Sequence, residues 1–64
     1  MRLSDFWERM DLVLGRGYAR SWAADQHLAE LGGRTVLEAL AEGAQAREVW
    51  RAVCLHAPVP RYLR

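Results

Sequence analysis

Two pairs of ionisable residues have spacings that suggest chemistry. His27 and Glu30 are three residues apart, so on a helix they share a face and could both contact a metal ion. Cys54 and His56 are two residues apart, a helical spacing that separates the side chains, and Cys54 falls on an apolar stripe. Two ligands do not complete a metal site, and neither pair joins a nucleophile to a base. We therefore expect no catalytic residue, no metal site, no cofactor and no enzymatic activity.

Arg47 and Arg51 are the residues best placed to contact nucleic acid, because they lie one turn apart on the outer face of a helix expected over residues 45–56. Residues 35–53 have the order of a helix-turn-helix: a short helix, a turn containing Gly43, and a second helix with Val49 at a core position. The net charge of +1 gives little attraction to nucleic acid. DNA binding, or a DNA-repair accessory role, is therefore the alternative function, and nucleic acid is a disfavoured but open partner.

Glu38 and Glu42 also weaken the helix-turn-helix interpretation, because both occupy positions that are usually apolar in that motif.

Asp25 is a candidate for a buried polar residue. It is expected within the apolar arc of the second helix, where a carboxylate needs a hydrogen-bond partner. We expect Asp25 to be a buried polar residue that accepts from a tryptophan N–H, from an arginine or from the amides that open the third helix.

Four short helices must position these residues, and apolar periodicity places them over residues 5–14, 18–31, 36–42 and 45–56. Ser4 can cap the first helix, or Asp5 can do so with Glu8 in capping-box spacing. Thr35 and Glu38 form a capping box at the start of the third helix. No strand is expected. The sequence predicts an all-α fold: a compact four-helix bundle over residues 1–57, followed by a flexible, extended proline-containing tail over residues 58–64.

Three tryptophans in 64 residues could form a recognition surface or a core. Trp7, Trp22 and Trp50 each lie on the apolar arc of a different helix, which favours the core. So short a chain needs bulky side chains, because its single cysteine excludes an intramolecular disulfide. The predicted core consists of Phe6, Trp7, Met10, Trp22, Leu28, Leu40, Val49, Trp50 and Val53.

Leu12 and Leu55 have no place on the inner arcs of their helices, so they are the candidate contacts for a partner. The first residues do not resemble a signal peptide, and no apolar run approaches the length of a membrane span. The single cysteine is consistent with a reducing compartment. The main hypothesis is therefore a cytoplasmic protein–protein interaction module, without a membrane, that binds another protein or forms a homo-oligomer.

Four sequence blocks support a family resemblance. They are L-S-D-F-W-E-R-M at the start, Y-A-R-S-W-A-A-D in the second helix, L-A-E-L-G-G-R-T-V-x-E-A-L in the middle and V-W-R-A-V-C near the end. Together they resemble an actinobacterial family of short proteins classed as a domain of unknown function. The resemblance implies genes that often lie near those for the recombinase RecA and its regulator RecX. It implies no activity, cofactor or catalytic residue.

Overall fold

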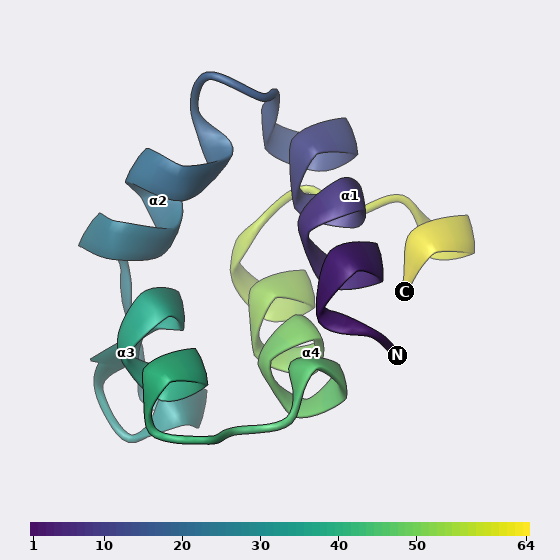
Figure 1. The fold of residues 1–64 in the computed structure, drawn as a ribbon. Helices are drawn as coiled ribbons and strands as arrows, with labels where there is room; N and C mark the ends of the chain where they lie inside the picture. Colours follow the sequence, from purple (N-terminus) through teal and green to yellow (C-terminus); the bar gives the residue numbers. More distant parts are fainter.

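A computed structural model describes residues 1–64 and shows four helices surrounding one core (Figure 1). The helices are α1 (Leu3–Leu14), α2 (Ala19–Asp25), α3 (Val36–Ala41) and α4 (Ala46–His56). Helix α1 packs against α2 and α4, and α3 also packs against α2 and α4. The predicted, mostly helical four-helix architecture is therefore confirmed, with shifted boundaries and one added element.

Capping explains where α1 and α3 begin. Helix α1 starts at Leu3, two residues earlier than predicted, and the Asp5 carboxylate accepts a hydrogen bond from the Arg2 backbone N–H at 3.2 Å. At α3 the predicted capping box is present. The Glu38 N–H donates to Thr35 Oγ1 at 3.1 Å, and the Thr35 N–H donates to Glu38 Oε1 at 2.8 Å.

The prediction of one helix over residues 18–31 is wrong, as is the absence of strands. Helix α2 ends at Asp25, and β1 (His27–Leu28) then pairs antiparallel with β2 (Arg34–Thr35), with His27 opposite Thr35. Between them lie the 3₁₀ helix η1 (Ala29–Leu31) and two glycines at positive φ, +70° and +82°. Glycine accepts this left-handed backbone without steric cost, so the chain reverses tightly where apolar periodicity alone indicated a continuing helix.

Asp25 is exposed, so its predicted burial is also wrong. The buried residues of α2 are Ala19, Trp22 and Ala23. Asp25 is the last residue of the helix and lies two positions beyond Ala23, so its side chain turns away from the core. It needs no buried hydrogen-bond partner.

Residues 58–64 are not extended throughout, because Arg61–Leu63 form the 3₁₀ helix η2. Val59 is buried in the core, and Leu63 is half-buried against it. The Leu63 carbonyl accepts a hydrogen bond from the Trp50 indole N–H at 2.8 Å. A buried indole N–H needs an acceptor, and the end of the chain supplies it.

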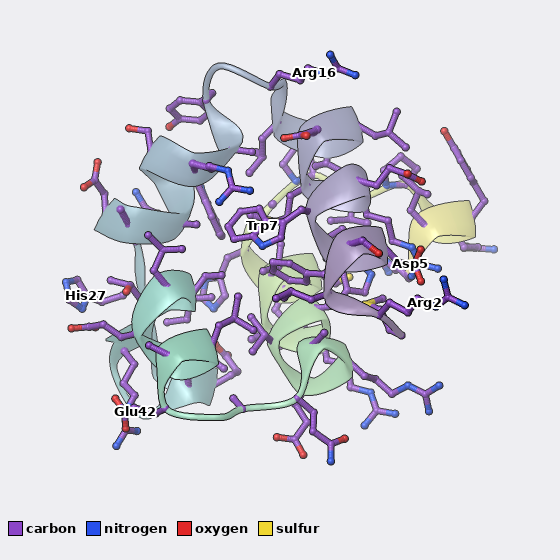
Figure 2. The ribbon with its side chains drawn as sticks, viewed as in Figure 1. Arg2, Asp5, Trp7, Arg16, His27 and Glu42 are labelled. Carbon is purple, nitrogen blue, oxygen red and sulfur yellow. The ribbon has the colours of Figure 1, made fainter.

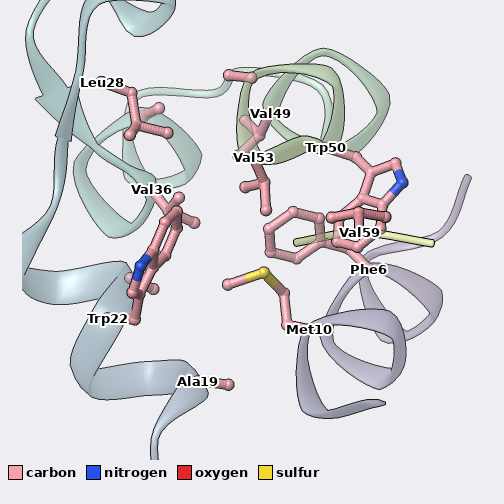
Figure 3. Packing of buried hydrophobic residues seen from close by; sticks show 13 residues of the cluster. Phe6, Met10, Ala19, Trp22, Leu28, Val36, Val49, Trp50, Val53 and Val59 are labelled. Atoms are coloured by element: carbon pink, nitrogen blue, oxygen red, sulfur yellow. The ribbon is translucent and has the colours of Figure 1, made fainter. Parts of the chain in front are cut away.

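Edge-to-face aromatic contacts hold α1 against α4 in the core (Figure 3). The Phe6 ring meets Trp7 with centroids 5.2 Å apart and Trp50 at 5.9 Å. Trp7 is only half-buried, and the Arg20 guanidinium lies 4.1 Å from its ring centroid, which joins α2 to α1. Of the residues expected in the core, the structure buries Phe6, Met10, Trp22, Leu28, Val49, Trp50 and Val53, and leaves Trp7 and Leu40 half-buried against them.

Candidate functional site

Four of the nine arginines line one open pocket of about 380 Å³. We call this the arginine pocket, and its lining residues are Met1, Arg9, Arg47, Trp50, Arg51 and Arg64. They come from α1, α4 and the two ends of the chain, which Figure 1 shows on the same side of the molecule. Segments far apart in the sequence thus converge on one basic surface.

Trp50 and Arg9 form the inner part of the arginine pocket. The Trp50 side chain is 3% exposed, and the Arg9 guanidinium lies 6.0 Å from its ring centroid. Arg9 also donates to the Leu63 carbonyl at 3.4 Å. Arg47 and Arg51 are exposed and lie one turn apart on α4. Arg9 is therefore held in place, while Arg47 and Arg51 face solvent.

None of the four arginines has a carboxylate within 4.0 Å. The ion pairs of the structure are Arg34–Glu42 and His56–Glu30, and neither includes one of these arginines. Two like charges one turn apart on a helix cost about 0.2–0.5 kcal/mol in helix stability. Folding stability therefore does not explain why Arg47 and Arg51 share this face. Their guanidinium groups are free to form paired hydrogen bonds with a carboxylate or a phosphate.

An apolar groove of about 420 Å³ adjoins the arginine pocket. Its lining residues are Met1, Leu3, Leu40, Ala44, Gln45, Ala46 and Arg47. Met1 and Arg47 line both concavities, so the apolar surface continues directly into the basic one. Leu3 is 51% exposed, which leaves apolar area available for contact.

A third concavity, the acidic pocket, has a volume of about 430 Å³ and lies by η1 and the α3–α4 connection. Its charged residues are Glu30, Arg34, Glu42 and Glu48. Arg34 Nε lies 3.0 Å from both carboxylate oxygens of Glu42. His56 Nε2 lies 2.5 Å from Glu30 Oε1, and this hydrogen bond lowers the pKa of Glu30. Two of its three carboxylates thus have partners within the chain.

The structure separates the residues that sequence reasoning considered for catalysis. The His27 ring nitrogen Nδ1 lies 2.9 Å from the Gly33 carbonyl, while Glu30 contacts His56 instead of His27. Cys54 is half-buried, and burial raises the pKa of its thiol. No three His, Cys, Asp or Glu side chains gather where they could hold a metal ion. None of the helices combines the length and apolar character that a membrane crossing requires.

The two residues proposed for nucleic-acid contact, Arg47 and Arg51, do lie together, but with two arginines that sequence reasoning missed. Arg9 is three residues after buried Phe6, a spacing that places it at the edge of the buried face of α1, and this signal could have identified it. Arg64 was missed because residues 58–64 were expected to extend away from the core. Leu12 and Leu55 are exposed as expected, at 70% and 69%, and neither lines any of the three concavities.

Helices α3 and α4 have the order of a helix-turn-helix, with Ala39 and Val49 buried and Gly43 at φ +94° in the turn. Arg47 and Arg51 are exposed on α4, but the neighbouring flank of the helix carries Trp50, which is 3% exposed and donates its indole N–H to the Leu63 carbonyl. The end of the chain therefore packs beside the face that a recognition helix inserts into a DNA groove.

A family model described as "Protein of unknown function (DUF3046)" matches residues 1–62. No curated protein and no solved structure gives a significant match to this sequence. The function must therefore be inferred from the surface itself.

Proposed function

We propose that this chain, which belongs to the DUF3046 family of proteins of unknown function, is a cytoplasmic protein–protein interaction module without catalytic activity. The observation that carries the proposal is the continuity of the arginine pocket with the apolar groove through Met1 and Arg47. Arginine, methionine and aromatic residues are enriched at protein interfaces, and an apolar centre beside a charged rim is the usual interface arrangement.

This surface supports an interaction better than Leu12 and Leu55 do. Single exposed leucines are ordinary on protein surfaces, and these two line no concavity. The arginine pocket and the apolar groove instead combine exposed apolar area with cations that have no carboxylate partner. We therefore place the contact surface at the start of α1, the α3–α4 connection and α4.

The test is a pull-down from native lysate with the tagged wild type, with Leu3→Ser/Arg47→Glu and with Arg16→Glu as a control. Arg16 is exposed and lies outside all three concavities. We expect the wild type and the control to recover the same protein, and the double variant to lose it. Sedimentation of the purified chain detects binding to a second copy. A strict monomer that recovers no protein would contradict the proposal.

A helix-turn-helix DNA-binding protein is the second candidate, and the buried Ala39 and Val49 with Gly43 in the turn favour it. The gene neighbourhood with RecA and RecX, which the resemblance implies, would give this candidate a role in DNA repair. The test is a fluorescence-anisotropy titration with mixed duplex DNA at about 50 and 200 mM salt, a range over which phosphate contacts lose much affinity. We expect no binding. Binding that Arg47→Ala/Arg51→Ala abolishes would establish this candidate instead.

A further inference from the structure

The chemistry of the arginine pocket specifies the charge of its ligand. Arg47 and Arg51 are exposed, lie one turn apart and have no carboxylate within 4.0 Å. Each guanidinium presents a planar fork of donors that matches the two oxygens of a carboxylate or a phosphate. Two free forks side by side therefore suit a ligand with two neighbouring anionic groups.

The apolar groove specifies a second property of the same ligand. Leu3, Leu40, Ala44 and Ala46 offer only aliphatic surface, and the groove meets the arginine pocket at Met1 and Arg47. A ligand that fills both concavities must carry an apolar group next to its anionic groups. Burying that group removes aliphatic area from water on both partners, which favours association.

Nucleic acid fits this combination poorly. Single strands bind on exposed aromatic faces, but Trp50 is almost completely buried beneath Arg9. The net charge of +1 supplies little long-range attraction for a polyanion. Gln45 and Arg47 are the only side chains of the groove that can hydrogen-bond to base edges, and the other lining side chains are apolar. A peptide provides aliphatic side chains and carboxylates on one short segment.

We infer that the arginine pocket and the apolar groove together bind a peptide segment in which an aliphatic side chain neighbours at least two carboxylates. The aliphatic side chain occupies the groove, and the carboxylates pair with Arg47 and Arg51. This inference rests on the proposed function, since it names the chemistry of the protein partner. A second copy of this chain is a different occupant, and sedimentation distinguishes it.

The experiment is a selection from a displayed library of random linear peptides against the immobilised protein. Enriched peptides are then synthesised and titrated at about 0.15 M salt, where the screening length is about 8 Å and distant charges contribute little. The variant is Arg47→Glu/Arg51→Glu, and the matched control is Arg16→Glu/Arg61→Glu, which changes the net charge equally with exposed residues outside the three concavities. Circular dichroism verifies that each variant is folded.

We expect the enriched peptides to share an aliphatic residue beside acidic residues. The pocket variant should bind them at least about tenfold more weakly, which corresponds to about 1.4 kcal/mol, while the control binds as the wild type does. Replacing the peptide's acids by their amides should weaken binding to a similar degree.

Four results would overturn the inference. Enriched peptides without acidic residues would leave the proposed function standing but remove the charge pairing. A lysate partner that is recovered while no linear peptide is enriched would mean that the partner is not a short segment. Binding of duplex DNA by a protein that selects no peptide would identify phosphate as the ligand. If neither peptide nor lysate protein binds, the proposed function fails as well.

Discussion

The arginine pocket and the acidic pocket both include residues of α4, but they differ in whether their charged side chains form ion pairs within the chain. In the acidic pocket Glu42 pairs with Arg34 and Glu30 with His56. In the arginine pocket no guanidinium meets a carboxylate. Figure 2 shows Glu42 far across the view from Arg2 and Asp5, which lie at the start of α1 near the arginine pocket's Met1.

This difference distinguishes charged side chains that are paired within the fold from those that remain free to pair with another molecule. The pairs in the acidic pocket tie η1 to α4 and β2 to the end of α3, so their carboxylates already serve the fold. Arg47 and Arg51 connect nothing within the chain. A charge that contributes to no intramolecular pair is free to pair with a partner, which supports the proposal that the arginine pocket and its adjoining groove form the contact surface.

The largest effect is expected at Trp50, which forms the floor of the arginine pocket. Trp50→Ala should lower the free energy of unfolding by about 3–5 kcal/mol, because it leaves a cavity and removes the donor to Leu63. Trp22→Ala, on the other side of the core, should lose a similar amount. Chemical denaturation alongside the wild type measures both losses. A loss below about 1 kcal/mol would show that the aromatic core does not hold this fold together.

A smaller change in the free energy of unfolding should distinguish the paired arginine of the acidic pocket from the unpaired arginines of the arginine pocket. Arg34→Ala removes an exposed ion pair and should cost about 0.2–1 kcal/mol in the free energy of unfolding. Arg47→Ala/Arg51→Ala should cost nothing or gain a few tenths, about 0.2–0.5 kcal/mol, because it removes a repulsion. Urea denaturation of the two variants provides the comparison. A larger loss in the double variant than in Arg34→Ala would give the arginine pocket a structural role.

The sequence allowed four helices to be predicted, one of them too long, and two of the four arginines of the site. Thr35 and Glu38 signal a capping box locally, and the apolar stripe of α4 repeats regularly, so both elements could be read from short windows. Residues 26–35 could not, because pairing of β1 with β2 competes with helix propensity only in the presence of the core. The arginine pocket joins Arg9 to Arg64 across almost the whole chain, and no local pattern records that convergence.

Acid should weaken the fold through carboxylates outside the arginine pocket. The hydrogen bond from the Thr35 amide lowers the pKa of Glu38, and that with His56 lowers the pKa of Glu30, both from 4.5. A lowered folded-state pKa means that stability is present above the ordinary value and is lost as pH falls through the lowered one. Unfolding measured between about pH 6 and 3 should show this loss. Glu30→Gln/Glu38→Gln should flatten the curve, and an unchanged slope would contradict the assignment.

The smallest effect concerns Cys54, a half-buried thiol on which the positive charges of Arg9 and Arg64 act. Burial raises the pKa of its thiol, and the two arginines only partly oppose that rise. At pH near 7.5 we expect iodoacetamide to react more slowly with the folded chain than with the chain unfolded in urea, because the thiolate is the reactive form. Mass spectrometry follows the reaction. Equal rates would indicate that the fold does not protect the Cys54 thiol by burial.

The central claim is that the arginine pocket is free to bind carboxylates while Arg34 is already paired. The most direct measurement is an NMR titration of the isotope-labelled protein with acetyl-Leu-Glu-Glu-amide, following the arginine Nε–H and tryptophan indole N–H signals. We expect the signals of Arg47, Arg51 and Trp50 to shift and that of Arg34 to stay in place. Uniform shifts of all nine arginines, or a larger shift at Arg34 than at Arg47 and Arg51, would contradict the account.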